Sequence, residues 1–383
     1  MRSNSMINTI IRFDHVSKIF PDGTKAVDDV SFEINEGECI TFVGPSGCGK
    51  TTTVKLLNRL VEPTHGNIYL NGKDTVKVDV IALRRSIGYV IQDVGLFPHM
   101  TVAQNISLVP RLIGWPIEDQ ETRTDELLNL VGLEPSAFRN RYPHQLSGGQ
   151  KQRVGVARGL AADPPVILMD EPFGALDPIT RAQLQDEFLR LRLRLRKTIL
   201  FVTHDIDEAI KLGDRMAVMR NGKIIQFDPP AKILREPSDP FVRNLIGREC
   251  GLKLMKLSKI SDIMEFPSNT IHEKSKLTEA KRSMEEYHSD VLLVTDDGGS
   301  FRGVVRFEHL LNRMDGTVAE VMERTPTPVK IDEEIRPTLE LMLKKKMVWL
   351  PVIDRDERLM GIVTMTHFAC FFATEGRVEE EAV

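Results

Sequence analysis

Residues 44–52 read GPSGCGKTT, and this stretch decides the fold because it fits the phosphate-binding pattern G-x-x-x-x-G-K-[ST]. It lies between an apolar run, residues 39–43, and a helix-like run, residues 52–60. The pattern requires a strand, a loop and a helix in this order. The sequence therefore predicts an α/β domain in which this P-loop holds the phosphates of a nucleotide.

The residue types of the loop suit phosphate binding. Glycines let the main chain close around an anion with its N–H groups turned inward, and the following helix adds the positive end of its dipole. Lys50 can reach the β- and γ-phosphates, and the Thr51 hydroxyl is placed to ligate Mg²⁺. The predicted nucleotide-binding residues of the loop are Gly44, Pro45, Ser46, Gly47, Cys48, Gly49, Lys50, Thr51 and Thr52.

The composition excludes several classes of protein. A chain of 383 residues is long enough for two or three domains, and its formal charge of −4 gives no basic field for nucleic acid. The four cysteines lack metal-ligand spacing and are typical of reduced cytosolic thiols. No uncharged apolar run reaches about 18 residues, and residues 1–9 lack the core of a signal peptide. We expect a cytosolic chain that reaches a membrane only through a partner.

The residues around the P-loop are typical of strands and then of helices. Residues 11–43 alternate apolar and polar side chains before the apolar run, and residues 66–92 predict further strands around the Asn71-Gly72 turn. From residue 97 to residue 132 the pattern becomes helical, with breaks at proline, glycine and tryptophan. This order predicts strands that lead into the P-loop, followed by a helical segment.

Residues 166–172, VILMDEP, form an apolar run that ends in two acids. A buried parallel strand delivers such carboxylates at its C-terminal edge, where ligands bind in α/β sheets. We predict that Asp170 holds Mg²⁺ through its hydration shell and that Glu171 polarises a water for attack on the γ-phosphate. The P-loop upstream supports this interpretation, because an apolar strand ending in Asp-Glu is weak evidence by itself.

Residues 146–150, LSGGQ, predict a second anion site. Ser147 can cap the helix that follows, and Gly148 and Gly149 expose its N-terminal amides. One chain thus carries two phosphate-binding motifs, the P-loop and LSGGQ. With this motif the sequence resembles the nucleotide-binding subunit of ABC transporters, whose signature is LSGGQ, and the motifs of that family span roughly residues 11–230.

The resemblance implies a homodimer in which the P-loop of one subunit and the signature of the other enclose the same ATP, with Mg²⁺. Phe20 resembles the aromatic residue that stacks on adenine, Gln92 the Q-loop glutamine, Asp177 the D-loop aspartate and His204 the switch histidine. The predicted catalytic residues are Glu171, His204, Gln92 and Lys50; the ATP contacts outside the P-loop are Phe20, Gln92, Ser147, Gly148, Gly149, Gln150 and Asp177; and the metal ligands are Thr51, Gln92 and Asp170.

Some of these residues have a simpler interpretation. Phe20 could be a core residue, because Phe13 is nearby and the family more often has tyrosine at the stacking position. His204 could be a satisfied histidine at a strand end. The helix after Asp177 carries an apolar face and a set of arginines that we interpret as a solvated flank rather than a nucleic-acid patch. These arginines are Arg190, Arg192, Arg194 and Arg196.

The charge of ATP suggests how such a subunit acts. When the two subunits of a dimer close around ATP, contacts from both subunits to the triphosphate become favourable. Hydrolysis then removes the triphosphate that holds the two subunits together. In the family this closing and opening of the dimer drives a membrane-spanning permease, which contacts the region around residues 92–115 here. A substrate-binding protein takes part indirectly. The subunit would lie at the cytoplasmic face of the membrane as a peripheral protein.

The second half of the chain repeats itself. Residues 228–250 are rich in proline and predict a connector. Shifting residues 254–311 by 58 positions superimposes identical residues without gaps, among them Met264 on Met322, Met284 on Met342, Val294 on Val352, Asp296 on Asp354, Gly303 on Gly361, Val305 on Val363 and His309 on His367. Two copies are too few for a solenoid and predict a pseudo-symmetric pair.

Each copy predicts the same order of elements. A short helix, at Ile263-Met264 or Val321-Met322, precedes a longer helix and then two strands that flank an Asp-rich turn. This order resembles a tandem cystathionine-β-synthase-type (CBS) pair, a regulatory module that often binds adenine nucleotides.

The CBS pair departs from the nucleotide-binding pattern of that family. Such copies usually follow the last strand's glycine with Ser or Thr and then Asp, whereas this chain has Arg306 and His309 in the first copy and Thr364 and His367 in the second. The missing aspartate weakens the case for AMP or ATP. Three interpretations stay open: cyclic di-AMP binding, sensing of ionic strength, or a purely structural pair.

The predicted fold is a P-loop NTPase of the ABC cassette type, α/β in class, followed by a tandem α+β CBS pair. The cassette combines a parallel core sheet, an antiparallel β subdomain and a helical subdomain. The predicted ranges are 1–236 for the ATPase domain, about 93–160 for its helical subdomain, 237–253 for a linker, 254–311 and 312–372 for the two CBS copies, and 373–383 for an acidic tail.

This architecture resembles the ATP-binding subunit of importers for quaternary-ammonium osmolytes, namely glycine betaine, carnitine and choline. The substrate rests on the architecture alone, since no residue of this chain would touch it. One alternative is an importer for another amine or amino acid, with the CBS pair as a dimer brace. Another is a soluble ABC ATPase of translation or DNA repair, although those carry two cassettes or long coiled-coil insertions, which are lacking here.

Overall fold

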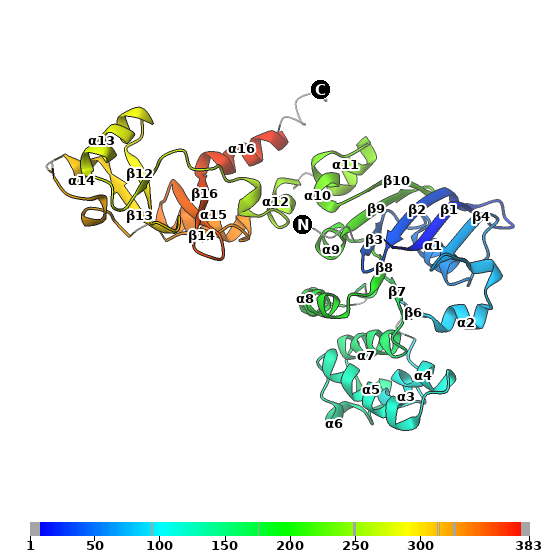
Figure 1. Ribbon diagram of the computed structural model, residues 1–383. Coiled ribbons are helices and arrows are strands. Elements are labelled where there is room, and N and C mark those ends of the chain that lie inside the picture. Colours follow the sequence, from blue (N-terminus) through cyan, green and yellow to red (C-terminus); the bar gives the residue numbers. More distant parts are fainter. Residues whose placement is uncertain are drawn as a thin grey trace. The chain divides into compact units, whose positions relative to one another are not determined.

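The computed structural model describes residues 8–92, 95–174, 176–247, 250–311, 313, 315–324 and 327–376. The chain divides into two compact units, Met1–Arg248 and Glu249–Val383, which Figure 1 shows in blue to green and in yellow to red. None of the helices in the described residues is long and apolar enough to cross a membrane.

The first unit is built on a six-stranded sheet with the order β10-β9-β3-β8-β7-β6. All neighbouring pairs are parallel except β9 and β10. Every residue of β3, β7 and β8 is buried, as expected for parallel strands covered on both faces. The strands are β3 (Cys39–Val43), β6 (Ile87–Val90), β7 (Val166–Asp170), β8 (Thr198–Val202), β9 (Arg215–Arg220) and β10 (Lys223–Asp228).

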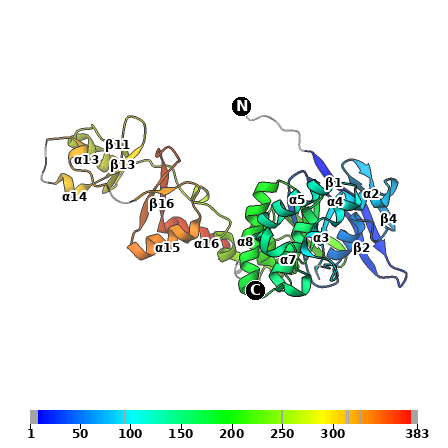
Figure 2. The same cartoon turned by 90° about the horizontal axis from the view of Figure 1, so that it is seen from below.

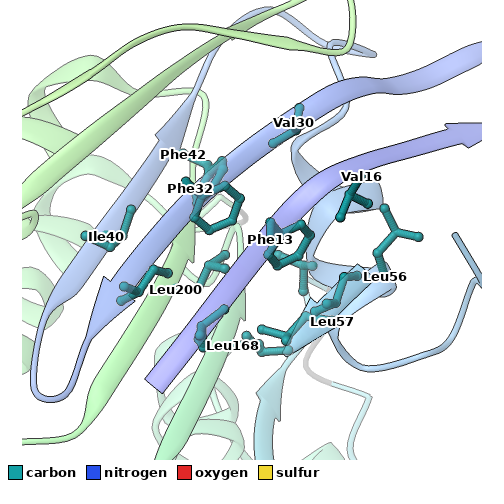
Figure 3. Packing of buried hydrophobic residues seen from close by; sticks show 14 of the residues in the cluster. Phe13, Val16, Val30, Phe32, Ile40, Phe42, Leu56, Leu57, Leu168 and Leu200 are labelled. Atoms are coloured by element: carbon teal, nitrogen blue, oxygen red, sulfur yellow. The ribbon is translucent and has the colours of Figure 1, made fainter. Parts of the chain in front are cut away.

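A second, antiparallel sheet with the order β2-β1-β4-β5 packs against the first. The alternation predicted for β2 is present, because Val30, Phe32 and Ile34 are all buried. Figure 3 shows Phe32 of β2 between Phe13 of β1 and Phe42 of β3; the rings of Phe13 and Phe32 stack at 4.5 Å. The strands are β1 (Thr9–Ile19), β2 (Lys25–Asn35), β4 (His65–Leu70) and β5 (Lys73–Asp74).

The predicted helical segment after residue 97 forms several short helices around an apolar cluster that includes Ile106, Leu127 and Val154. Its helices are α3 (Val102–Ile106), α4 (Leu108–Leu112), α5 (Ile117–Leu130), α6 (Pro135–Phe138) and α7 (Gly148–Leu160). The strand prediction for residues 66–92 was incomplete, because the 3₁₀ turn η1 (Thr75–Lys77) and α2 (Val80–Arg85) lie between β5 and β6. Asp74 and Asp79 cap these two elements, and capping by Asp is the signal that the strand interpretation overlooked.

The proline-rich range 228–250 is more ordered than a connector. It forms α10 (Pro230–Arg235) and α11 (Pro240–Ile246), and each begins with proline at a position where a missing N–H has no cost. Ile233 and Val242 are fully buried. The connector interpretation was wrong for these residues because proline at a helix start resembles proline in a loop.

The second unit contains two three-stranded sheets, β11-β12-β13 and β14-β15-β16. Four elements of the first copy begin 58 residues before their counterparts, which confirms the repeat and its order; Figure 2 shows the two copies as separate groups. The first copy has β11 (Thr270–His272), α13 (Leu277–Glu286), β12 (Val291–Thr295), β13 (Phe301–Arg306) and α14 (Phe307–Leu310). The second has β14 (Val329–Lys330), α15 (Ile335–Lys345), β15 (Trp349–Ile353), β16 (Leu359–Thr364) and α16 (Met365–Gly376).

The two copies exchange their first segments. Ile260, Ile263 and Met264 pack into the core of the second copy, whereas Val318 and Val321 pack into the core of the first. Each folded copy therefore contains a segment from the other covalent repeat. The short helices predicted at residues 263–264 and 321–322 were wrong: the segments carry single 3₁₀ turns immediately upstream, η3 (Ile260–Asp262) and η4 (Val318–Glu320).

Helices lie at both ends of the second unit. α12 (Cys250–Met255) overlaps the end of the range predicted as a linker, and it packs against α16. α16 continues to Gly376, so residues 373–376 of the predicted acidic tail form the end of a helix. Residues 377–383 of that tail lie outside the described residues.

Candidate functional site

The P-loop connects the end of β3 to α1 (Lys50–Leu57). The helix begins and ends earlier than the predicted run of residues 52–60, and Arg59 adopts a left-handed conformation after it. Gly44 and Gly49 are required, since a Cβ atom at either position would clash with the main-chain oxygen of Met219 or Ala26. No side chain caps α1, so its first N–H groups are directed to whatever the loop encloses.

Lys50 lies inside the loop. Its side chain is buried, and Nζ donates hydrogen bonds to the main-chain oxygens of Gly44 (2.7 Å) and Pro45 (3.0 Å). The Cys48 Sγ atom is 3.7 Å from the same ammonium. The loop thus holds a positive charge beside the open end of α1, where an anion gains from both.

The two acids predicted at the end of β7 lie beside the P-loop helix. Thr51 Oγ1 donates a hydrogen bond to Asp170 Oδ1 at 3.0 Å. Burial raises the pKa of Asp170, while the hydrogen bond from Thr51 acts in the opposite direction. Asp170 and Thr51 together present hard oxygen atoms, which are the ligands that Mg²⁺ prefers.

Glu171 brings together residues from three neighbouring strands. Its Oε2 atom lies 3.1 Å from His204 Nδ1, after β8, and 3.4 Å from Gln92 Nε2, after β6. Glu171 itself adopts φ of 46°, and its N–H bonds to the main-chain oxygen of Val202. The side chain of His204 is 57% exposed, so it is not a buried structural histidine; its partner is Glu171.

The LSGGQ motif forms the start of α7, as predicted. Ser147 is the N-cap: its Oγ accepts from the N–H of Gln150 at 3.3 Å, and Gln150 Oε1 accepts from the N–H of Ser147 at 3.0 Å. Ser147 and Gly148 are exposed. In the described residues no hydrogen bond or ion pair connects this motif to the P-loop, so the two anion devices are separate within one chain.

Asp177 and Phe20 have simpler surroundings. Asp177 caps α8 (Pro178–Leu195), and the hydrogen bond from Thr180 lowers its pKa. Phe20 follows β1 and is partly buried, with Lys18 Nζ 5.3 Å from the ring centre. The two interpretations of Phe20, an adenine contact and a core residue, both stay predictions. On α8, Arg190, Arg194 and Arg196 are exposed as predicted, whereas Arg192 bonds to Asp214 and to the main-chain oxygen of Leu212.

A hollow of about 330 Å³ lies between the sheet and the helical segment. The contact region predicted from the sequence, residues 92–115, covers part of this lining but leaves out the arginines upstream and downstream that line the same hollow. Burial raises the pKa of Tyr89, which also lines it, to about 12. The lining residues are Arg84, Arg85, Ile87, Gly88, Tyr89, Ile91, Gly95, Phe97, Leu108, Val109, Arg158, Gly159, Ala162 and Pro164.

The CBS positions that would face a nucleotide are paired with acids of the exchanged segments. His309 Nε2 lies 3.0 Å from Glu323 Oε1, and Arg306 Nε lies 3.5 Å from Glu323 Oε2. In the second copy His367 Nε2 lies 3.4 Å from Glu265 Oε2. No group of three His, Cys, Asp or Glu side chains that could hold a metal occurs in the described part of the chain.

A parallel sheet with a glycine-rich loop at the start of a helix, and acids at the end of a neighbouring strand, defines a P-loop nucleoside triphosphatase. The sequence matches the ABC transporter family over residues 27–174 and the CBS domain family over residues 260–316 and 318–372.

Known relatives cover nearly the whole chain. The carnitine transport ATP-binding protein OpuCA of Listeria monocytogenes is 48% identical over 93% of this chain and 90% of its own length. The choline transport ATP-binding protein OpuBA of Bacillus subtilis is 47% identical, over 93% and 94%. The osmoprotectant import ATP-binding protein OsmV of Salmonella typhimurium is 42% identical, over 91% and 92%.

Among solved structures, the dimeric ABC transporter cassette MJ0796 is 35% identical and matches with a TM-score of 0.53, over 58% of this chain and 99% of that chain. The chain belongs to the family of ABC transporter ATP-binding subunits, the ATP-hydrolysing components of transport systems, and it carries a CBS pair. The resemblance predicted from the motifs is confirmed, and similarity over the full length to transport subunits argues against the alternative in translation or DNA repair.

Proposed function

We propose that this chain powers the import of quaternary-ammonium osmolytes, such as glycine betaine, carnitine and choline, through a membrane permease. The full-length similarity to carnitine, choline and osmoprotectant transport subunits carries the choice of substrate class. An importer for another amine or amino acid is the alternative. Binding and hydrolysis of ATP at the P-loop site supply the energy.

The residues of the P-loop fit a bound triphosphate. The uncapped end of α1 and the Lys50 ammonium supply donors, and Lys50 can exchange the oxygens of Gly44 and Pro45 for phosphate oxygens. Mg²⁺ would be held by Thr51 and Asp170, with Gln92 nearby, and it would supply charge that neutralises the phosphates. Phe20 is sufficiently exposed to stack on adenine.

Glu171 is placed to act as the general base. Its carboxylate accepts a proton from a water aligned with the γ-phosphate, and His204 and Gln92 hold that carboxylate in position. The second ring nitrogen of His204 has no hydrogen bond to any described residue, and it would face the phosphate. All three side chains follow strand ends at one edge of the sheet, where the P-loop also lies.

The exposed signature motif supports a head-to-tail homodimer. Ser147, Gly148, Gly149 and Gln150 of one subunit would complete the site of the other, with Asp177 near the seam. The separation of the two anion devices in one chain and the likeness to a dimeric cassette support this assembly. In this arrangement neither subunit alone has a complete catalytic centre.

The hollow beside the helical segment suits a cytoplasmic helix of the permease. It combines arginines with apolar side chains, and exposed apolar residues at Leu112, Ile113 and Ile117 continue the surface. The chain would thereby be held at the cytoplasmic face of the membrane, and a substrate-binding protein would act on the other side of the permease.

The CBS pair would adjust the activity to osmotic or ionic conditions or to cyclic di-AMP. The partly exposed ion pair of Arg306 with Glu323 supports a response to salt, because such pairs are screened at high ionic strength. ATPase activity of the reconstituted complex is measured while salt and cyclic di-AMP are titrated separately. A response to either identifies the signal, and a flat response to both leaves the CBS pair as a dimer brace.

The transport proposal is tested by reconstituting the chain with its permease and binding protein in liposomes that contain ATP. We expect uptake of labelled glycine betaine, carnitine or choline, and loss of uptake with Lys50→Ala because the phosphates lose their main charged contact. Uptake of a different amine would overturn the substrate class, and ATP hydrolysis without any uptake would overturn the transport role.

A further inference from the structure

Helices α8 and α9 (Ile206–Leu212) lie side by side and share a buried polar network. Gln185 Nε2 on α8 donates a hydrogen bond of 2.9 Å to Glu208 Oε1 on α9, and both side chains are buried. Lys211 Nζ donates to Gln185 Oε1 at 3.3 Å and pairs with Asp186 at 2.7 Å. Burying a carboxylate is costly even when it is hydrogen-bonded, so this contact requires an explanation beyond packing.

One end of the network reaches Gly174 and Leu176, which precede α8. Arg181, one turn before Gln185 on the same face of α8, donates to the main-chain oxygens of Leu176 (3.1 Å) and Gly174 (3.4 Å). The same guanidinium lies 3.8 Å from Asp205 Oδ2. Arg181 thus contacts both the segment that ends at Asp177 and the residue that follows His204.

The other end of the network fixes the start of α9. Asp205 caps this helix by accepting the N–H of Glu208 at 3.1 Å, and Thr203 Oγ1 accepts the N–H of Asp205 at 3.0 Å. The Glu208 carboxylate also interacts with the Thr203 hydroxyl. Thr203 and Asp205 flank His204 in the chain, so α9 is connected to the side chains on both sides of that histidine, by the Glu208 N–H to Asp205 and by the Glu208 carboxylate to Thr203.

We propose that Gln185 and Glu208, together with the Arg181–Asp205 pair, are positioning residues that fix His204 relative to Leu176 and Asp177. The two contacts between the helices are one helical turn apart, so they prevent α9 from rotating or sliding on α8. A displacement of Leu176 and Asp177 is therefore transmitted to His204, and through it to Glu171. This inference rests on the proposed ATPase mechanism, in which Asp177 lies near the dimer seam.

The experiment compares Glu208→Gln, which keeps hydrogen-bonding atoms, with Glu208→Met, which keeps the volume without them. In the full-length protein we expect Glu208→Met to lower kcat roughly ten- to hundredfold with the KM for ATP unchanged, because the loss is one of position. Glu208→Gln should retain most of the activity. Gln185→Met is the second variant, and it should reproduce the loss if Glu208→Met fails to fold.

The role as a positioning residue is separated from a structural role by repeating the change in a His204→Ala background. Single-turnover rates should show that Glu208→Met causes no further loss there, because its target is already absent. The same factor lost in both backgrounds, or an unchanged kcat in Glu208→Met and Gln185→Met, would overturn the proposal. A wild-type chain without ATPase activity would instead contradict the proposed function, which this control measures first.

Discussion

Two acidic side chains of the ATPase unit and two of the CBS unit lie in opposite environments. In the ATPase unit Asp170 and Glu208 are only 6% and 4% exposed, and burial raises the pKa of both. In the CBS unit Asp297 and Asp332 lie at the surface, where hydrogen bonds from Lys274 and Arg355 lower their pKa. Asp170 and Glu208 thus resist ionisation, whereas Asp297 and Asp332 are held in the ionised form.

This difference indicates where acids serve chemistry and where they serve local structure. A buried carboxylate loses its hydration, and neighbouring groups replace that hydration only in part. We therefore expect buried carboxylates where their charge or hydrogen bonds act on a ligand or on another residue. A surface carboxylate beside a lysine or arginine costs little and contributes little. We therefore expect a carboxylate-to-amide change at Glu171 in the ATPase unit to alter activity, and the same change at Asp297 in the CBS unit to leave it unchanged.

The largest expected effect is that of Glu171→Gln. Glutamine keeps the shape of the side chain but cannot accept the proton of the attacking water, so turnover should fall by roughly 10²–10⁴-fold. ATP should still bind, and an ATP-bound dimer should accumulate. Phosphate release and size-exclusion chromatography with ATP measure the two effects.

The matched control for Glu171→Gln is Asp297→Asn, the same chemical change in the other unit, which should leave turnover unchanged. Normal turnover in Glu171→Gln would contradict the role of Glu171 as the base. Loss of turnover in both variants would mean that acids of the ATPase unit and of the CBS unit do not differ in their effect on activity.

The residues that form the predicted catalytic centre could be identified from local sequence. Glu171 and His204 each follow an apolar run, and parallel strands end at one edge of a sheet, so the two had to meet near the P-loop. The glycines of the loop and the Ser147 cap are equally local signals, because a turn or a helix start depends on a few neighbouring residues.

The hydrogen bonds between helices α8 and α9 and the exchange of CBS segments could not be predicted from local sequence. The contact of Gln185 with Glu208 depends on which faces of α8 and α9 pack together, and nothing in either helix alone specifies this. Similarly, Ile260 and Val318 occupy equivalent places in the two repeats, so the sequence does not reveal that each packs in the other copy. β11 and β14 are too short to show an alternating pattern.

A smaller effect is expected for the stability of Glu208→Gln, and it depends on pH. The pKa of Glu208 in the folded protein is raised above its ordinary value of 4.5, so its contribution to stability is complete below that pH and is lost as pH rises through the folded pKa. Glutamine does not titrate. The variant should therefore gain stability relative to the wild type between about pH 4.5 and pH 7.

Thermal unfolding of the ATPase unit at the two pH values measures this gain, which should amount to a few degrees in Tm. Glu208→Met serves as the control, because it also lacks the charge but loses the hydrogen bonds at every pH. A stability difference between Glu208→Gln and wild type that does not change with pH would mean that the buried carboxylate carries no penalty.

The smallest effect is expected for Asp297→Asn, and its sign is opposite. Lys274 holds the pKa of Asp297 below its ordinary value of 3.8, so the carboxylate stabilises the fold above that pH and loses this contribution as pH falls through the folded pKa. The variant should therefore be slightly less stable than the wild type at pH 7 and equal to it in strong acid. High salt should remove the difference, because exposed charges are screened over a Debye length of about 3 Å at 1 M. A gain in stability at pH 7, or a loss that persists in high salt, would show that this surface acid is not the weakly coupled group that its exposure indicates.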